Sequence, residues 1–340
     1  MRICISKLLF LAAFFACGCG SGEDGEPDSD REPGEKPAEF DAKARVEAAD
    51  DAVSAPRAEP AAIRGTKVVV LGSGTPVPNP DRSGPATVVI AGGRPYIVDA
   101  GPGIVRRAAE AARRGVRQLD PRLLDTLFLT HLHSDHTAGL PDLWLTPAAV
   151  GRPRPLHVFG PPGSARMARH LEAAWSEDLA VRTEDDSPGR SRGYGLEVEE
   201  IEPGVVFEDE NVKVTAFAVD HGSWEHAYGY RFDAPDRSVV VSGDTAPVDS
   251  VVEACDGCDV LVHEVYCEAG WRPGPPSWRR YHATHHTSAP QLAEIASRAK
   301  PELLVLTHLL LFGCSKERLL SEVTAGYDGE VWLPDDLQIL

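Results

Sequence analysis

The sequence predicts an α/β domain with two sheets and helices on their outer faces. Short apolar runs rich in Val, Ile and Leu alternate along the chain with longer segments of helical periodicity. Several of these runs carry no polar residue on either face, which is typical of strands that are covered on both sides. The chain also has 340 residues, which is long enough for one large domain or two small ones.

The composition is that of an ordinary folded protein, but the charge is not. Hydrophobic residues make up 42% of the chain and charged residues 25%, which excludes a multi-span membrane protein, a coiled coil and a wholly disordered chain. Lys and Arg number 34 against 52 Asp and Glu, so the net charge is −18. Because a field of that sign repels polyphosphates, we do not expect nucleic acid as a partner.

Residues 1–19 have the layout of an export signal. A basic start precedes the apolar run Leu8–Ala16, which is too short for a comfortable membrane span. The run ends at Cys17 in a pattern that resembles a bacterial lipoprotein signal, and Cys19 is a second candidate for acylation. We therefore expect a protein exported to the periplasm or cell surface and held at the membrane by a lipid anchor alone. An ordinary cleaved signal without lipid is the alternative.

Two further regions follow the signal. Residues 20–63 are rich in Glu, Asp, Pro, Ala and Gly and lack a periodic apolar pattern, which predicts a disordered acidic tether. Residues 64–340 form the expected folded domain. Within it, residues 65–340 hold 26 basic and 39 acidic residues, a net charge of −13, so the tether does not account for the acidity.

The first half of the domain begins with strands. Thr66–Leu71 is an apolar run that ends in a Gly-Ser-Gly loop, and Ala86–Ala91 and Tyr96–Val98 are joined by a Gly-Gly turn. Helical periodicity then alternates with further apolar runs. The expected elements are the helix Ile104–Arg114, the strand Leu127–Thr130, a helix after Ala138, the strand Leu156–Phe159 and a helix at Ser164–Ser176.

The second half repeats this alternation. It follows Arg182–Gly195, a polar segment with Pro and Gly that predicts a loop or an insertion. The expected strands are Val212–Val219, Tyr228–Phe232, Ser238–Ser242, Val260–His263 and Leu303–Thr307, and the expected helices are Pro290–Ala299 and Lys316–Ala325.

The strongest chemical signal is the motif His-Leu-His-Ser-Asp-His at residues 131–136, directly after an expected strand. In an extended loop, His131 and His133 point the same way and can hold one ion. Asp135 and His136 come after a turn and can face a second ion nearby. Imidazole nitrogens and carboxylate oxygens are suitable ligands for zinc, manganese or iron.

Further candidate ligands follow other strands. His221 comes after the strand Val212–Val219, Asp244 follows Ser238–Ser242, and His308 closes Leu303–Thr307. Loops at one edge of a sheet are where a site is normally assembled. A lone His or Asp at a strand end is weak evidence, but together with the six-residue motif these residues predict a metal site.

These residues, in this order, resemble the metallo-β-lactamase superfamily over nearly all of residues 65–340. The resemblance implies a four-layer αββα sandwich with a site at one edge that holds two zinc ions, with manganese or iron as alternatives. It implies that Asp244 bridges both ions, together with a hydroxide. It further implies His131, His133 and His221 as ligands of the first ion and Asp135, His136 and His308 as ligands of the second.

Other motifs look like the ribonuclease Z-like branch of this superfamily. They are Leu71-Gly-Ser-Gly-Thr-Pro76, Gly229-Tyr-Arg231, Ser242-Gly-Asp-Thr245 and the pair His263-Glu264. In contrast, His285-His-Thr-Ser288 and Leu306-Thr-His-Leu-Leu310 look closer to arylsulfatase-like and small-ester members. The basic, Gly-rich insertion that grips tRNA in ribonuclease Z enzymes has no counterpart here, because acidic residues interrupt Arg182–Gly195.

The same resemblance assigns catalytic roles. Asp135 would orient the hydroxide, and His286 matches a late catalytic histidine that is not a metal ligand. Partly charged near neutral pH, His286 would stabilise the transition state or protonate the leaving group. His263 and Glu264 would support the site and orient His286. A structural pair at a strand end is an equal alternative for those two residues.

Several aromatic residues and cysteines have no fixed role. Trp224, Trp271, Trp278 and Tyr281 either wall an aryl-accepting pocket or pack in the core. His226, His282 and His285 are expected at the rim. A Cys-x-x-Cys motif without a partner motif does not favour a zinc ribbon, and disulfides are compatible with export. The sequence does not determine which of Cys255, Cys258, Cys267 and Cys314 pair with one another.

The leading hypothesis is an exported dinuclear-zinc hydrolase of small anionic esters, either phosphodiesters or aryl sulfates, that uses the metal-bridged hydroxide. One alternative is a ribonuclease Z-like zinc phosphodiesterase that processes tRNA 3′ ends, and another is a lactonase. A non-catalytic, metal-binding surface lipoprotein is an alternative of a different class. The sequence leaves the oligomeric state open, with a homodimer among the options.

Overall fold

The computed structural model describes residues 65–184 and 191–340. The expected signal with Cys17 and Cys19 and the expected tether lie outside the described residues, as does the middle of the segment 182–195. In the described part of the chain, no helix is long and apolar enough to cross a membrane.

The first sheet has six strands in the order β1-β2-β3-β4-β5-β6. The first three strands pair antiparallel, and β3 to β6 pair parallel. The strands are β1 Lys67–Gly72, β2 Ala86–Ala91, β3 Arg94–Val98, β4 Thr126–Phe128, β5 Leu156–Gly160 and β6 Leu196–Glu200.

The second sheet has seven strands in the order β13-β12-β11-β10-β9-β8-β7. Strands β10 to β13 pair parallel, and β7 to β10 pair antiparallel. The strands are β7 Gly204–Glu208, β8 Lys213–Ala218, β9 Tyr228–Asp233, β10 Ser238–Val241, β11 Val260–Tyr266, β12 Leu303–Leu310 and β13 Glu330–Trp332.

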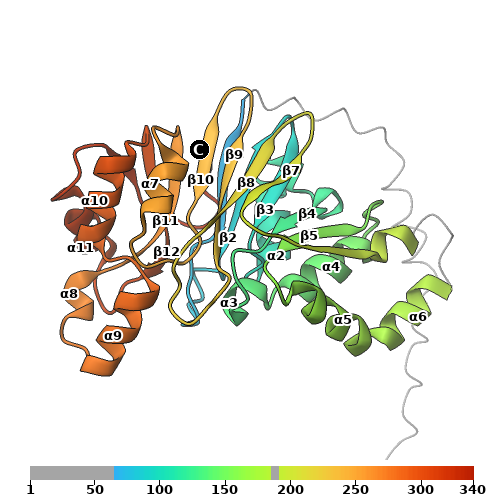
Figure 1. Ribbon diagram of the computed structural model, residues 1–340. Helices are drawn as coiled ribbons and strands as arrows, with labels where there is room; N and C mark the ends of the chain where they lie inside the picture. The colour runs from blue at the N-terminus through green and yellow to red at the C-terminus, as the bar shows by residue number, and fades with distance from the viewer. Residues whose placement is uncertain (1–64, 185–190) are drawn as a thin grey trace, which may run out of the picture. The chain divides into compact units, whose positions relative to one another are not determined.

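Helices cover the outer face of each sheet (Figure 1). Against the first sheet lie α2 (Ile104–Arg113), α4 (Leu140–Ala149) and α5 (Ser164–Ala174), and against the second lie α7 (Asp249–Cys255), α10 (Ala289–Ala299) and α11 (Lys316–Thr324). The remaining helical segments are α3 Ser134–Thr137, α6 Ser176–Glu184, α8 Glu268–Trp271, α9 Pro276–His285 and the 3-10 turns Arg117–Leu119, Pro121–Leu123 and Ser191–Tyr194.

Strand β1 shows why the sequence builds four layers. Val69 and Leu71 pack toward α2 and α4, whereas Val68 and Val70 pack between the two sheets. Successive side chains of a strand point to opposite faces, so an uninterrupted apolar run supplies two cores at once. The expected αββα sandwich is therefore confirmed.

Some elements differ from those expected. The helix expected at Ser164–Ser176 ends at Ala174, and α6 then extends into Arg182–Gly195, so that segment is not a loop throughout. Strands β6, β7 and β13 and helices α8 and α9 were not expected. Acidic side chains interrupt the apolar pattern on β6, and the apolar runs of β7 and β13, residues 205–207 and 331–332, are too short to indicate a strand.

Two disulfides connect the four cysteines of the domain. Cys255, at the end of α7, pairs with Cys258 just before β11. Cys267, directly after β11, pairs with Cys314 in the loop that follows β12. The pairing that the sequence left open is thereby assigned, and both bonds lie in the half of the sandwich formed by the second sheet.

Candidate metal centre

The expected ligands meet where strands of both sheets end. The motif at 131–136 follows β4, His221 follows β8, Asp244 follows β10, and His308 lies near the end of β12. In the second sheet β10 and β12 run in the same direction, and β8 does too because β9 is antiparallel to both of its neighbours. Their carboxyl ends therefore share one edge, as expected from the sequence.

Hydrogen bonds join the two sheets at this edge. The backbone N–H of Tyr228, at the start of β9, donates to the carbonyl of Thr130 at 2.9 Å. The hydroxyl of Tyr230 donates to the carbonyl of Leu129 at 2.6 Å. The residues just before His131 are thus fixed to the second sheet, which holds the motif against the ligands contributed by that sheet.

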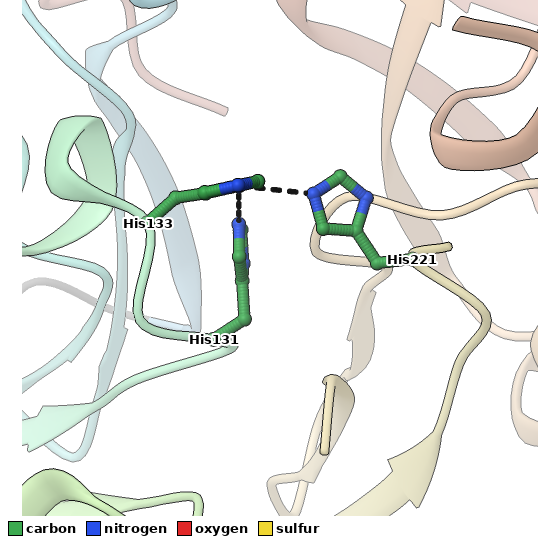
Figure 2. Close-up of side chains that lie close together, drawn as sticks. All are labelled: His131, His133 and His221. Atoms are coloured by element: carbon green, nitrogen blue, oxygen red, sulfur yellow. Dashed lines mark hydrogen bonds between the residues drawn. The ribbon is translucent and has the colours of Figure 1, made fainter. Parts of the chain in front are cut away.

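Three histidines form the first group of donors (Figure 2). His133 Nδ1 lies 2.9 Å from His131 Nε2 and 3.1 Å from His221 Nε2. The indole N–H of Trp224 donates to His133 Nε2 at 2.9 Å, so Nδ1 carries the ring proton and points it at the other two histidines. A neutral imidazole binds a metal through its unprotonated nitrogen, so a cation that binds at Nδ1 requires the ring proton of His133 to move to Nε2.

The second group contains Asp135, His136 and His308. Asp135 Oδ2 lies 3.5 Å from His136 Nε2 and 3.3 Å from His308 Nε2. Asp244 Oδ2 lies 3.3 Å from each of the same two nitrogens. Donor atoms of His131, His136 and Asp244 also lie within 4.8 Å of one another, so Asp244 borders both groups.

A bulge places His308 in this group. The pairing of β11 with β12 runs from Glu264 opposite Thr307 directly to Val265 opposite Leu309, so His308 has no opposite residue. Its φ of 43° lies in the left-handed region, which few residues other than glycine adopt. The extra residue redirects the side chain, and such bulges are common next to functional sites.

Asp99, which was not expected from the sequence, orients two of the imidazoles. It directly follows β3, is buried, and accepts a hydrogen bond from His136 Nδ1 at 2.8 Å. It also accepts from the hydroxyl of Thr130 at 2.9 Å, and that hydroxyl lies 3.0 Å from His131 Nδ1. Because both Nδ1 atoms act as donors, the Nε2 atoms keep their lone pairs for the cluster.

The third imidazole is oriented by the backbone. His221 Nδ1 donates to the carbonyl of His285 at 2.7 Å. Gly222 makes this approach feasible, because a Cβ atom there would lie 2.3 Å from the His285 ring. The φ of Gly222 is +59°, so both its conformation and the space around it require glycine.

The cluster fits divalent cations. His136 Nε2 is buried, has no hydrogen-bond partner in the described part of the chain, and faces both Asp135 and Asp244. Within the described ranges, no Lys or Arg pairs with either carboxylate, although both are buried. Buried carboxylates need compensating charge, and nitrogen and oxygen donors in this number suit zinc, manganese or iron.

The electrostatics of the histidines agree with this fit. Burial lowers the pKa of His221 to about 3 and that of His131 well below its usual range. Both rings are therefore neutral at pH 7, which is the form that binds metals. Burial also opposes the protonation of His136, but the charges of Asp244 and Asp99 outweigh it and raise the pKa of that histidine. A cation must displace the extra proton.

His286 lies beside the donor groups, directly after α9. Its Nδ1 is 3.4 Å from Glu264 Oε2 and 4.0 Å from Asp244 Oδ2. Burial lowers the pKa of His286 to about 3, so the expectation of a partly charged ring near neutral pH is wrong. The sequence shows the residue but not its burial, and burial is what keeps the ring neutral.

The two residues of the pair His263-Glu264 make different contacts. Glu264 Oε1 accepts from the backbone N–H of Thr287 at 2.8 Å and of Thr245 at 3.4 Å, so it links the residues after His286 to those after Asp244. His263 Nδ1 donates to the carbonyl of Glu264 at 2.6 Å, and its Nε2 is buried without a hydrogen-bond partner among the described residues. Glu264 thus contacts His286, whereas the hydrogen bond of His263 is to the backbone.

The comparisons with known proteins agree with this geometry. Residues 94–309 match the model of the Beta-lactamase superfamily domain. A ribonuclease Z of Mycolicibacterium gilvum is 34% identical over 279 residues, covering 80% of this chain and 94% of the relative. A ribonuclease Z of Mycobacterium bovis is 34% identical over 246 residues, covering 71% of this chain and 85% of the relative.

Solved structures show the same fold at lower identity. The short form of human tRNase Z superposes with a TM-score of 0.60 at 22% identity, covering 81% of this chain and 98% of the other. The metallo-β-lactamase fold protein YhfI from Bacillus subtilis gives 0.61 at 18% identity, with the same coverage of 81% and 98%. The chain belongs to the metallo-β-lactamase superfamily, as a ribonuclease Z-like, metal-dependent hydrolase.

Proposed function

We propose that this protein is a phosphodiesterase of the ribonuclease Z type, which hydrolyses a P–O bond in RNA. The observation that carries the proposal is the double donor group around Asp244, in a chain that is 34% identical to a ribonuclease Z over 94% of that relative. These relatives favour the RNA alternative of the sequence analysis over its leading hypothesis of small phosphodiesters or aryl sulfates.

The donor set would hold two zinc ions, with manganese or iron as alternatives. When bound, the ions would supply an activated water and stabilise the negative charge that develops on the phosphate oxygens. The residues of the first ion would be His131, His133 and His221, those of the second Asp135, His136 and His308, and Asp244 would be shared. Asp99, Thr130 and the carbonyl of His285 keep three of the imidazoles, those of His131, His136 and His221, in the tautomer that this role requires.

His286 and Glu264 would together supply a proton to the leaving group. Burial and the negative charge of Asp244 raise the pKa of Glu264 well above its usual range, which favours the protonated form of its carboxyl group. This carboxyl group faces His286 Nδ1 at 3.4 Å. As His286 Nε2 gives its proton to the leaving oxygen, Nδ1 takes the proton of Glu264, and the imidazole stays neutral.

A small phosphodiester is a second candidate, and the charge of the folded domain favours it. Residues 65–340 carry a net charge of −13, which repels a long polyanion. A single phosphate needs attraction only at the site itself, where two divalent cations would provide it. The same cations would also serve an aryl sulfate, which is therefore included in the test.

One substrate panel distinguishes these candidates. The purified protein, loaded with zinc or manganese, is offered a tRNA precursor with a 3′ trailer, bis(p-nitrophenyl) phosphate, p-nitrophenyl sulfate and a chromogenic lactone. Cleavage of the precursor that is lost with chelator and in Asp135→Ala, but kept in the remote control Asp236→Asn, supports the proposal. Hydrolysis of bis(p-nitrophenyl) phosphate without RNA cleavage or RNA binding at low salt favours the second candidate. Bound metal without turnover of any substrate leaves the non-catalytic alternative.

Export with a lipid anchor is also proposed. Support comes from the signal-like residues 1–19 and from the two disulfides, because such bonds persist mainly in oxidising compartments. Labelling with a radioactive fatty acid tests the anchor: label on the unaltered protein and none on a Cys17→Ser, Cys19→Ser variant is the expected result. Label on both proteins, or on neither, contradicts it.

A further inference from the structure

Tyr281 is an exposed aromatic residue held in a fixed orientation. It lies in the last half of α9, and 44% of its surface is exposed. One face of its ring stacks on His285, with 4.1 Å between ring centroids and 23° between planes. His282 contacts it edge-on at 5.1 Å and 87°. One face of the ring is therefore covered, and its contacts with His285 and His282 hold the side chain in place.

The Tyr281 ring is connected to the metal centre through His285. His285, on which Tyr281 stacks, lies 5.2 Å from the ring of His221 and binds the Nδ1 atom of that residue through its carbonyl. Burial and the negative charges of Asp244 and Asp135 raise the pKa of Tyr281, so the phenol lies within the field of both carboxylates. The Tyr281 ring is therefore separated from the candidate ligand His221 by His285, which contacts both residues.

The three tryptophans considered with Tyr281 are engaged otherwise. Trp271 donates from its indole nitrogen to the carbonyl of Arg279 at 3.1 Å, within the α8–α9 segment. Trp278 packs on Phe312 at 4.4 Å between ring centroids. Trp224 donates to His133 and stands edge-on to it at 5.0 Å, so it supports a candidate metal ligand.

We propose that Tyr281 stacks on a planar aromatic ring of the substrate, either a nucleobase or an aryl group, next to the scissile phosphate. This inference rests on the proposed phosphodiesterase function and specifies the substrate class. The ring must be joined to the phosphate through a short linker, because Tyr281 is separated from the candidate ligand His221 by a single residue, His285. Alkyl phosphodiesters would lack this contact and would bind more weakly.

The loss of affinity that follows removal of such a stacking residue is known in magnitude. Alanine substitution of an aromatic residue that stacks on a base typically lowers affinity by roughly five- to 150-fold per base. Because His285 and His282 already fix the Tyr281 ring, little rotamer freedom is lost on binding. We therefore expect an effect of about tenfold, which lies within this range.

Binding measured without turnover tests the inference. Titration calorimetry on the zinc-loaded protein compares adenosine 5′-monophosphate with ribose 5-phosphate, which carries the same phosphate without a base. In Tyr281→Leu the affinity for the nucleotide should fall about tenfold, and that for ribose 5-phosphate should not change. Tyr281→Phe should keep the preference, because it keeps the ring. Trp175→Leu removes another exposed aromatic ring, which caps the end of α5, and is the matched control.

The outcomes separate this inference from the proposed function. Equal affinity for both ligands in the unaltered protein, no binding of either, or a preference that survives in Tyr281→Leu overturns the role of Tyr281. The zinc content of each variant, measured in parallel, shows whether His221 and its group are intact. Hydrolysis of phosphodiesters without a preference for a ring refutes the inference alone, whereas a ring preference without any hydrolysis refutes the phosphodiesterase proposal.

Discussion

Replacing Asp99 with Asn should weaken zinc binding without unfolding the protein. The carboxylate accepts hydrogen bonds from His136 Nδ1 at 2.8 Å and from the backbone N–H and hydroxyl of Thr130 at 2.9 Å each. An Asn side chain has one acceptor oxygen and one donor nitrogen. Its oxygen can still accept from Thr130, but its amide nitrogen would then face His136 as a donor. The proton of that imidazole must move to Nε2, which is the atom that faces the cluster.

The size of the effect follows from the number of imidazoles involved. Loss of one group that orients a metal ligand typically costs about 10- to 100-fold in metal affinity or activity. This corresponds to about 1.4 to 2.7 kcal/mol. Asp99 orients His136 directly and His131 through Thr130, so we expect a loss near the upper end. The φ of Asp99 is 62°, a conformation that Asn adopts as readily as Asp, so the backbone should not be strained.

The assay is competition for zinc against a chromogenic chelator, with thermal unfolding of the metal-free protein as a check on folding. Asp236→Asn is the matched control, because Asp236 accepts from the backbone N–H and hydroxyl of Thr66 in the same way but is exposed and remote from the cluster. An unchanged zinc Kd in Asp99→Asn would refute the reasoning. An equal loss in Asp236→Asn would show that the effect is not specific to the site.

Three further predictions concern the same fold. Gly222→Ala should lower both zinc content and the unfolding temperature, because its Cβ would meet the His285 ring at 2.3 Å and its φ of +59° costs about 1–2 kcal/mol for a residue other than glycine; normal zinc content would contradict this. Removing metal with a chelator should lower the unfolding temperature of the unaltered protein. The same treatment should lower that of Asp135→Ala by less, because this variant already binds metal weakly; equal shifts of the two proteins in calorimetry would contradict this. Hydrogen bonds from Ser238 lower the pKa of Asp259, so this group stabilises the fold above its unfolded pKa of about 3.9 and loses that contribution as the pH falls through its lower folded value. Asp259→Asn should therefore cost a few tenths of a kcal/mol at pH 7 after solvent screening, and urea unfolding should show no difference at the most acidic pH.

The predictable part of the site consists of local signals. Each of the seven expected ligands stands at or just after the end of an apolar strand, and the structure brings all of them together. Neither the pattern nor the geometry tests which of them bind metal, so their assignment stays a prediction. The strands themselves were predictable because buried strands of a sandwich are apolar on both faces, as Val68–Leu71 illustrates.

The parts that were missed depend on contacts between distant residues. Asp99 is 31 residues from Thr130 and 37 from His136, and a single Asp after a strand gives no sign of such partners. Strand β6 pairs with β5 although its sequence, Leu-Glu-Val-Glu-Glu, is largely acidic, because backbone hydrogen bonds to a neighbour do not require apolar side chains. The neutral state of His286 follows from burial by residues of other elements.

The charge of the folded domain constrains how an RNA substrate can be held. With a net charge of −13 over residues 65–340, attraction of phosphates cannot come from the surface as a whole. At the centre, Asp135 and Asp244 have no Lys or Arg partner among the described residues, so bound divalent cations would reverse the local sign. An RNA bound in this way would contact the protein mainly through the scissile phosphate and the base stacked on Tyr281. Because few phosphates would be neutralised, its affinity should depend only weakly on salt, unlike that of a protein with a basic groove.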